Sequence, residues 1–417
     1  MFGPGDDDCG IAEVQSRVAK LQTGINLTSG LLAAVVTPYL GRLSDIWGRK
    51  ALITITSLGS IINEVLFIVV DRNVNTISAR WLFLGAFFDG ISGSFMAAMA
   101  LSYSYVSDCT SPALRNSAFG YLDATYSIGL ALGPTLISHL DLRLGIPTLP
   151  FYIALGCHVL YVVFLICFVP ESLSQERQTL ARQARDLKKS SWQSSISELN
   201  PLKLIAAVKS HEPDRPDAYL RNLILLALAD TVYFGISVGT TNIIILYGGF
   251  VFGWSDVEIS GFISATCICR ICALLLILPS LNFLLRHESS APHTSGGRVD
   301  TIDLYQVRGA LFLSVLGYSG YAIAPSGAAM LVSGMVAALG DISSPSLQSS
   351  LTKQMPEEYT GQLLGVMGQL HALSRIAIPT MMNMIYAKLV GIFPQGVFLC
   401  LTAGMVLAKG CTWFIGS

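Results

Sequence analysis

Three aspartates lie inside long apolar stretches, and each has polar side chains beside it at helical spacing: Asp89, Asp230 and Asp341. An ionised carboxylate is disfavoured in a low-dielectric environment, so such a side chain can take up a proton near neutral pH. Each aspartate could instead form a structural ion pair with Arg270 or Arg375, which also lie in apolar stretches. Charged groups within a membrane are costly and commonly functional. The sequence therefore predicts these residues to bind protons or substrate: Asp89, Asp230, Asp341, Glu64, Arg270 and Arg375.

Membrane helices must position these charges. The chain of 417 residues is 52% hydrophobic and 13% charged, whereas soluble domains carry about 25% charged residues. Stretches of about 20 apolar residues are long enough to cross a bilayer as helices. The sequence predicts eleven such spans, near residues 24–41, 51–70, 80–105, 117–139, 149–169, 221–250, 257–281, 309–325, 328–350, 363–388 and 394–415.

The polar segments between the spans indicate the orientation and the domain organisation. If residues 41–50 are cytoplasmic, the loops on their side hold 17 of the 26 Lys and Arg residues and the opposite side holds six, as the positive-inside rule requires. The predicted parts are an extracytoplasmic segment at 1–24, a first helical bundle at 25–170, a cytoplasmic loop at 171–219 and a second bundle at 220–417. A second polar segment, His287 to Tyr305, is predicted to be a loop.

Composition excludes several classes of function. The net charge of -1 does not suggest a nucleic-acid partner. Cys267, Cys269 and Cys272 lie within one apolar stretch without a matching set elsewhere, so they are expected to pack as small apolar residues. The sequence offers no nucleophile-base set and no metal-ligand spacing. We therefore expect no enzymatic activity, no metal and no cofactor.

Residues 41–50 read Gly-Arg-Leu-Ser-Asp-Ile-Trp-Gly-Arg-Lys, and they stand between two predicted spans as a short loop. This segment resembles the signature loop between helices 2 and 3 of the major facilitator superfamily, G-x-L-x-D-R-x-G-R-K, with Ile46 where the family usually has arginine. The resemblance implies that Asp45 caps a helix of the opposite half and that Arg49 pairs with Asp108. It thus implies a conformational latch formed by Gly41, Asp45, Gly48, Arg49, Lys50 and Asp108.

A second motif has the spacing Gly120-x8-Gly129-x3-Gly133-Pro134. Glycines at such spacing let a neighbouring helix approach closely, and Pro134 lacks the N–H that its helical turn requires. The motif resembles the helix-5 motif of drug/proton antiporter families. A plain packing face is the alternative. Ala86 stands where those families carry an arginine, and this moves the resemblance toward the tetracycline-transporter and proton-coupled folate transporter branch.

The expected fold is thus an all-α membrane protein of the major facilitator type. That family usually has twelve helices in two halves, and the signature loop follows its second helix. Here the loop follows the first span, so we expect the first transmembrane helix to be missing, either by truncation or in a true eleven-helix protein. The resemblance also implies that helices 4, 7 and 10, which carry Asp89, Asp230 and Asp341, line a central cavity.

The expected function is secondary active transport of a small organic molecule by alternating access. The helix-5 motif favours proton-coupled efflux of a drug-like or secondary-metabolite substrate, and the mixed polar stripes suit an amphipathic or cationic molecule. Proton-coupled uptake is one alternative, and a non-transporting sensor or inactive remnant is another. The predicted partners are the lipid bilayer, the substrate and protons. The chain is expected to be monomeric and to lie in the plasma membrane rather than the vacuolar membrane.

Overall fold

Helices account for nearly all of the structure, a computed structural model that describes residues 12–144, 148–187, 217–288 and 300–415. These residues include no strand, so the all-α expectation is confirmed for them. Eight of the described helical stretches are long and apolar enough to cross a membrane. The other three predicted spans are also helices, but each carries charged or polar side chains that lower its hydropathy: α5 (Arg115–Leu144), α13 (Thr301–Ile323) and α16 (Thr360–Leu389).

The described chain forms two compact units. The first contains Met1–Tyr105, Leu140–Asn200 and Gly361–Leu373, and the second contains Val106–His139, Pro201–Thr360 and Ser374–Ser417. Most of α5 belongs to the second unit and the start of α16 to the first, so the units differ from the bundles expected at 25–170 and 220–417. That division stays a prediction.

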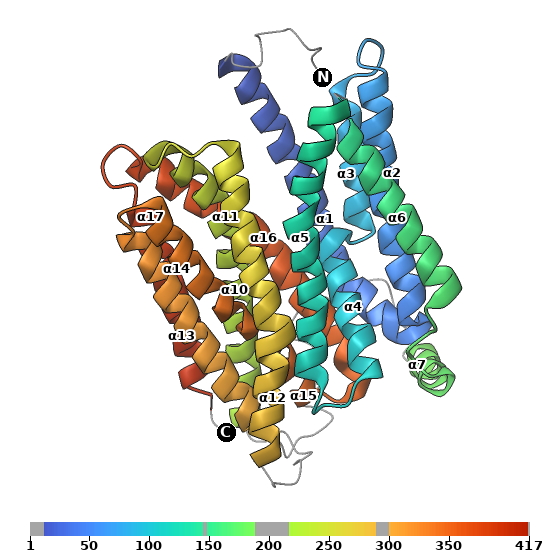
Figure 1. Cartoon of the computed structure of the whole chain (residues 1–417). Helices are drawn as coiled ribbons and strands as arrows, with labels where there is room; N and C mark the ends of the chain where they lie inside the picture. Colours follow the sequence, from blue (N-terminus) through green and yellow to red (C-terminus); the bar gives the residue numbers. More distant parts are fainter. Residues whose placement is uncertain (1–11, 145–147, 188–216, 289–299, 416–417) are drawn as a thin grey trace. The chain divides into compact units, whose positions relative to one another are not determined.

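The helices of the first unit come mainly from the N-terminal part of the chain. Within this unit α2 and α6 lie side by side (Figure 1), and α1 packs against both α3 and α7. The elements are α1 (Ala12–Trp47), α2 (Arg49–Arg72), η2 (Ala79–Trp81), α3 (Leu82–Ile91), α4 (Ser94–Cys109), α6 (Leu149–Phe168) and α7 (Gln175–Leu187).

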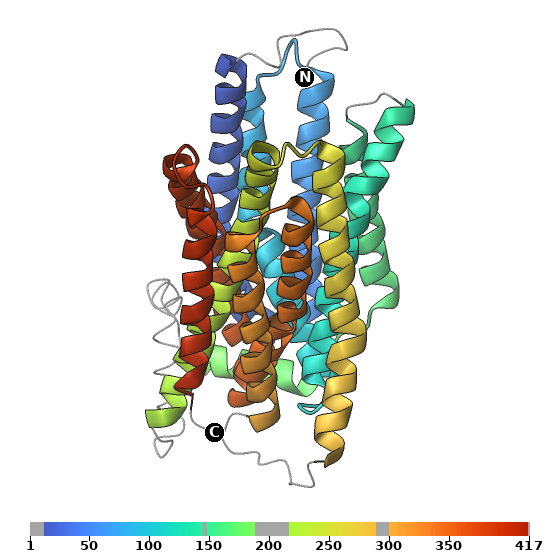
Figure 2. The ribbon, with the colours of Figure 1, turned by 60° about the vertical axis from the view of Figure 1, so that its left-hand side comes forward.

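The second unit holds the remaining helices. Within it α13 lies beside both α14 and α17, as Figure 2 shows from a second direction. Besides α5, α13 and α16 the elements are α10 (Asp217–Val251), α11 (Asp256–Cys272), the π-helix η3 (Ala273–Ile277), α12 (Leu278–Glu288), α14 (Gly327–Leu339), the 3-10 turn η4 (Gly340–Ile342), α15 (Ser343–Gln354), η5 (Glu357–Tyr359) and α17 (Gly396–Trp413).

The segment at residues 41–50 is not the loop that the sequence predicts. Helix α1 continues to Trp47, α2 begins at Arg49, and Gly48 alone makes the turn, with φ 102. The carboxylate of Glu171 accepts hydrogen bonds from the backbone N–H groups of Arg49 at 2.7 Å and Lys50 at 3.1 Å. A carboxylate at a helix N-terminus satisfies otherwise unpaired donors and opposes the helix dipole. This cap allows α2 to start directly after the turn.

Replacing Gly48 by alanine should therefore destabilise the protein. Its backbone conformation is one that essentially only glycine adopts, which costs another residue about 1–3 kcal/mol. A Cβ there would also lie 2.5 Å from Glu171 Oε2. We expect a lower thermal unfolding midpoint in detergent for Gly48→Ala. Gly410→Ala is the matched control, because Gly410 is helical with nothing within 4 Å of an added Cβ. Equal losses in the two variants would contradict this role of Gly48.

Helix α13 begins earlier than the sequence predicts. The polar residues 301–305 were expected in a loop and 309–325 in a span, yet the helix starts at Thr301. Asp300 caps it, since its carboxylate accepts a hydrogen bond from the N–H of Ile302 at 3.1 Å. An aspartate at the N-cap stabilises a helix start. Polar side chains in the first turns of α13 have partners on other helices, described below.

Candidate functional site

Asp89 lies on α3, in the interior of the first unit. Its carboxylate accepts hydrogen bonds from the hydroxyl of Ser29 on α1 at 2.6 Å and from that of Ser60 on α2 at 3.0 Å. A serine hydroxyl can either donate or accept a hydrogen bond. The two partners can therefore satisfy Asp89 in its ionised and in its protonated form.

The backbone beside Asp89 is irregular. The span at Ala79–Cys109 is divided into α3 and α4 by Gly93, with φ 90, and Ser94, with φ 52. The hydroxyl of Ser92 donates to the backbone carbonyl of Asp89 at 2.8 Å. Interrupted membrane helices are tolerated where the freed backbone groups are buried in protein or line a polar site. The sequence predicts one continuous span at 80–105, and this interruption corrects it.

Glu64 also belongs to the first unit, one turn after Ser60 on α2. One carboxylate oxygen lies 2.7 Å from Nδ1 of His158 on α6. The other oxygen, Oε2, is buried and has no hydrogen-bond partner among the described residues. The structure thus pairs Glu64 with His158, a residue of α6.

The second unit contains an ion pair between Asp341 and Arg270. Asp341 lies in the 3-10 turn η4, and Arg270 lies on α11 just before the π-helix η3. Arg270 Nε and the hydroxyl of Tyr233 on α10 both donate to the Asp341 carboxylate. Short π and 3-10 segments within longer helices are frequent at functional sites. The ion pair with an arginine that the sequence allows for each aspartate is thus present at Asp341.

Asp230 lies on α10, where its carboxylate accepts a hydrogen bond from the amide of Gln348 on α15 at 2.6 Å. The side chains are deeply buried, with 1% of Asp230 and 2% of Gln348 exposed. The amide oxygen of Gln348 has no hydrogen-bond partner among the described residues. Arg375 is exposed on α16. In the second unit, Asp230 and Asp341 therefore each bind polar side chains from another helix.

The expected latch residues lie around the Gly48 turn. The guanidinium of the fully buried Arg49 is 2.6 Å from the Asp45 carboxylate and 2.5 Å from the Ser44 hydroxyl. A Cβ added to Gly361, near the start of α16, would collide with both Asp45 and Arg49. Within the first unit, the pair thus lies directly against the first turn of α16.

Helix α1 approaches α16 closely through glycine. A Cβ on Gly41 would lie 2.5 Å from the carbonyl oxygen of Gly361 and 2.8 Å from the Cα of Gly365. The spacing Gly361-x3-Gly365 is a known signal of close helix packing in membranes, and it could have been read from the sequence. The latch role of Gly41, Asp45, Gly48, Arg49 and Lys50 stays a prediction.

Asp108, the remaining expected latch residue, lies at the end of α4, in the second unit. The pairing of Arg49 with Asp108 is untested and stays a prediction. Arg115 at the start of α5 is near Asp108: burial lowers the pKa of Arg115, and the Asp108 charge acts in the opposite direction. Arg115 also donates to the carbonyl of Ser107 at 3.3 Å.

The helix-5 glycine motif is only partly explained by packing. A Cβ on Gly120 would lie 2.6 Å from a methyl group of Leu278 on α12, so a close contact exists there. A Cβ on Gly129 or Gly133 would meet no atom within 4 Å among the described residues. The chain stays helical through Pro134. The role of Gly129, Gly133 and Pro134 in close helix packing stays a prediction.

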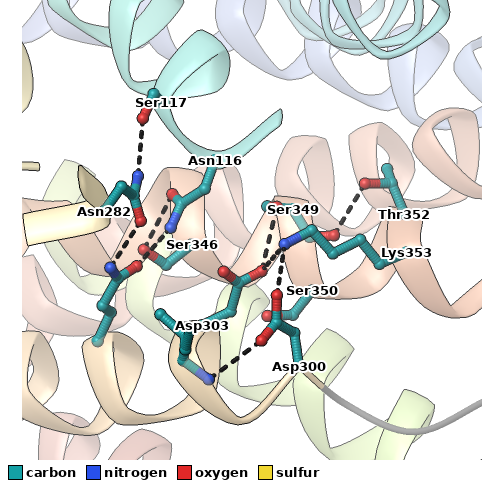
Figure 3. Close-up of polar contacts among 12 residues, drawn as sticks. Asn116, Ser117, Asn282, Asp300, Asp303, Ser346, Ser349, Ser350, Thr352 and Lys353 are labelled. Carbon is teal, nitrogen blue, oxygen red and sulfur yellow. Dashed lines mark hydrogen bonds and ion pairs between the residues drawn. The ribbon is translucent and has the colours of Figure 1, made fainter. Parts of the chain in front are cut away.

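A polar network in the second unit was not anticipated from the sequence (Figure 3). The amide of Asn116 on α5 donates to Gln306 on α13 at 2.6 Å, Gln306 donates to Asn282 on α12 at 2.7 Å, and Asn282 donates to Ser117 at 2.7 Å. The Ser346 hydroxyl on α15 adds a bond to Asn116 at 3.1 Å. Fully paired amides fix the relative positions of the helices that carry them.

A charged group lies beside this network (Figure 3). Lys353 Nζ on α15 is 2.5 Å from Asp303 Oδ2 and 3.2 Å from Asp300 Oδ2. Arg308, one turn after Asp303 on α13, donates to the carbonyl of Thr412 at the end of α17 at 2.9 Å. The first two turns of α13 are thus joined by side chains to four other helices. The sequence shows polar residues here, but it does not show which helices they reach.

The comparisons with known proteins agree with this arrangement. A family model described as Major Facilitator Superfamily matches residues 14–379. The chain is 29% identical over 413 residues to the MFS-type transporter avaJ of Aspergillus versicolor, covering 98% of this chain and 79% of that protein. It is 24% identical to hippocampus abundant transcript-like protein 1 of Bos taurus, covering 86% of this chain and 62% of that protein. The crystal structure of the human organic anion transporter MFSD10 (TETRAN) matches with a TM-score of 0.71 at 18% identity, covering 95% of this chain and 83% of that chain.

Proposed function

We propose that this chain, which belongs to the Major Facilitator Superfamily, couples the movement of a small organic molecule to that of protons. As a member of that family it is a multi-pass membrane protein, and it acts as a secondary transporter and not as an enzyme. The proposed substrate is a drug-like compound or secondary metabolite. The proposed direction is export across the plasma membrane, by a single copy of the chain.

The observation that carries this proposal is the position of Asp89 between two serine hydroxyls, at 2.6 Å and 3.0 Å. A proton carrier must be stable with and without its proton during each cycle. Ser29 and Ser60 can donate to the carboxylate and can accept from the carboxylic acid. Neither partner carries a charge that would hold Asp89 in one state. We therefore assign proton binding first to Asp89.

The other two aspartates differ from Asp89 in their partners. Arg270 and Tyr233 both donate to the carboxylate of Asp341, so Asp341 has a charged partner whereas the two partners of Asp89 are uncharged. Gln348 donates its amide N–H to Asp230, and rotation of this amide would present its oxygen instead. Asp230 is thus the second candidate for proton binding, and the pair of Asp341 with Arg270 is a candidate for substrate binding.

Uptake by proton symport is the second candidate function. The motif that favours export includes Gly129 and Gly133, and a Cβ added at either glycine would meet no described atom within 4 Å. Ala86 also replaces the arginine that antiporter families carry near this position. Both observations weaken the argument for antiport but leave proton coupling through Asp89 untouched.

Proteoliposomes that contain a pH-sensitive dye would test the coupling and its direction. We expect that adding a transported compound outside the vesicles changes the internal pH. Antiport would make the interior more alkaline, because protons leave as substrate enters, and symport would make it more acidic. The test panel should contain neutral, cationic and anionic drug-like compounds, with empty liposomes as the control. Transport that leaves the internal pH unchanged would contradict proton coupling, and a complete lack of transport would favour the sensor or inactive alternative.

A further inference from the structure

Among the described residues of the second unit, Arg270 has one close anionic partner, the carboxylate of Asp341. A guanidinium group stays protonated in proteins, and a charge within a membrane is costly unless it is compensated. The Arg270 side chain is 29% exposed and that of Asp341 is 12% exposed, so the pair is partly accessible. If Asp341 took up a proton, Arg270 would require another anion.

We propose that Arg270 is the binding site for the anionic group of an aromatic organic acid, which takes the place of the Asp341 carboxylate when Asp341 becomes protonated. This inference rests on the proton coupling in the proposed function and names its substrate class. It places the proton that binds with the substrate on Asp341 instead of Asp89, and the joint binding of proton and anion corresponds to uptake by symport, the second candidate above. It replaces the expectation of a cationic substrate. The guanidinium geometry matches carboxylates and sulfonates, which it can bind through two parallel hydrogen bonds.

The charges balance only when proton and anion bind together. The ion pair of Arg270 with Asp341 is neutral. A proton alone would leave the net charge at plus one, and an organic anion alone would bring it to minus one. Both together restore neutrality, so each should promote the binding of the other, and this coupling is reciprocal. The proton comes from water and is held by the Asp341 carboxyl group, so no bond to the substrate is formed or broken.

Tyr233 makes the exchange feasible at Asp341. Its hydroxyl donates to one carboxylate oxygen while Arg270 donates to the other. A tyrosine hydroxyl can also accept a hydrogen bond. When Asp341 is protonated, Tyr233 can accept from the new O–H group, and Asp341 keeps a partner after Arg270 turns to the substrate.

Further aromatic side chains lie near the pair within the second unit. Tyr318 and Tyr321 on α13 are within electrostatic reach of Asp341 and Arg270. The ring centroids of Tyr318 and Tyr321 are 5.7 Å apart, and those of Tyr321 and Phe398 on α17 are 5.4 Å apart. Aromatic rings prefer edge or offset contacts with one another, and arginine binds ring faces. An aromatic acid therefore suits this site better than an aliphatic one.

The groups that face the pair do not provide another proton acceptor at neutral pH. They are the phenols of Tyr233, Tyr318 and Tyr321 and the thiols of Cys267 and Cys269. Ordinary phenols titrate near pH 10 and thiols near 8.5. The proposal therefore places the proton on Asp341, the carboxyl group of this cluster.

Calorimetric titration of the full-length protein in lipid nanodiscs would test the inference. The probes are benzenesulfonate and 1-naphthalenesulfonate, which stay ionised over the whole pH range, and benzenesulfonamide is the uncharged control. We expect both sulfonates to bind and benzenesulfonamide not to bind. Because one proton binds with each anion, the Kd for a sulfonate should fall up to tenfold for each pH unit of acidification. Equal affinity for the uncharged control would overturn the inference.

Three variants make the test specific. Asp341→Asn mimics the protonated state, so it should bind benzenesulfonate with a Kd that no longer depends on pH. Arg270→Gln should weaken binding at least tenfold, and Arg270→Lys, which keeps the charge, should retain part of it. A persistent pH dependence in Asp341→Asn would overturn the inference, as would unchanged binding in Arg270→Gln. If a variant does not fold, the pH series on the unmodified protein still decides the outcome.

This test separates the substrate class from the proposed function. Proton-coupled movement of a neutral or cationic compound in proteoliposomes, without sulfonate binding at any pH, would leave the transporter proposal standing and overturn the role of Arg270. Sulfonate binding without any proton-coupled flux would support the role of Arg270 as an anion site and contradict the proposed function.

Discussion

Replacing Lys353 by alanine should strongly lower the stability of the protein. Lys353 lies 2.5 Å from Asp303 and 3.2 Å from Asp300, and the side chain of Asp303 is 0% exposed. Removing one partner of a buried ion pair leaves an uncompensated buried charge, which costs about 3–5 kcal/mol. We therefore expect a clear fall in the unfolding midpoint, measured in detergent by intrinsic tryptophan fluorescence.

Two further variants show whether the lost charge is the cause. Lys388→Ala removes an exposed lysine near the end of α16, so it should leave the midpoint almost unchanged. Adding Asp303→Asn to Lys353→Ala removes the buried carboxylate charge that Lys353 compensates and should recover much of the loss. A double variant as unstable as Lys353→Ala alone would mean that the lysine acts mainly through packing.

The sequence predicts where the helices of this chain lie because hydrophobic length has a direct meaning in a membrane. Each of the eleven expected spans coincides with helical structure. The ends of the helices were less predictable. Helix α1 extends to Trp47, and Glu171 caps the start of α2 directly after it. Helix α13 starts at Thr301 because Asp300 caps it there. Glu171 is separated from the turn it caps by over a hundred residues, and hydropathy carries no information on such a contact.

The candidate site was predictable in part for the same reason. Charges in apolar stretches identified Asp89, Asp230, Asp341, Glu64 and Arg270, and the structure shows a polar side-chain partner for each of them. The identity of those partners requires tertiary structure. Periodicity places Asp341 on one face of its segment, but it does not show that Arg270 and Tyr233 reach the same carboxylate.

Backbone irregularity is a second property that could not be predicted from hydropathy or residue spacing. Gly93 and Ser94 interrupt the span just after Asp89, Asp341 lies in a 3-10 turn, and a π-helix begins three residues after Arg270. Strained or irregular backbone persists where surrounding contacts determine it, and it gathers at functional positions. Its coincidence with three charged residues supports the choice of these residues over Arg375, which is exposed on α16.

Replacing Asp89 by asparagine should abolish proton-driven transport while leaving the protein folded. Asparagine has nearly the same shape, and its amide can still bond to Ser29 and Ser60, which lie 2.6 Å and 3.0 Å from the aspartate oxygens. It cannot bind or release a proton at any pH of the assay. A pH difference of one unit corresponds to about 1.4 kcal/mol per proton, so a carrier that moves one proton per substrate can sustain a gradient of about tenfold.

The measurement compares two modes of transport in the same proteoliposomes, with whichever compound the panel identifies. In Asp89→Asn the accumulation ratio driven by one pH unit should fall from about tenfold to one. Exchange of labelled for unlabelled substrate should continue, because it requires no net proton movement. Asp71→Asn, near the end of α2, is the matched control and should keep accumulation intact. If Asp89→Asn still accumulates substrate, the proton site is whichever of Asp230 and Asp341 uncouples transport when it is replaced by asparagine, because the carboxyl group that carries the proton must be the one whose loss uncouples transport.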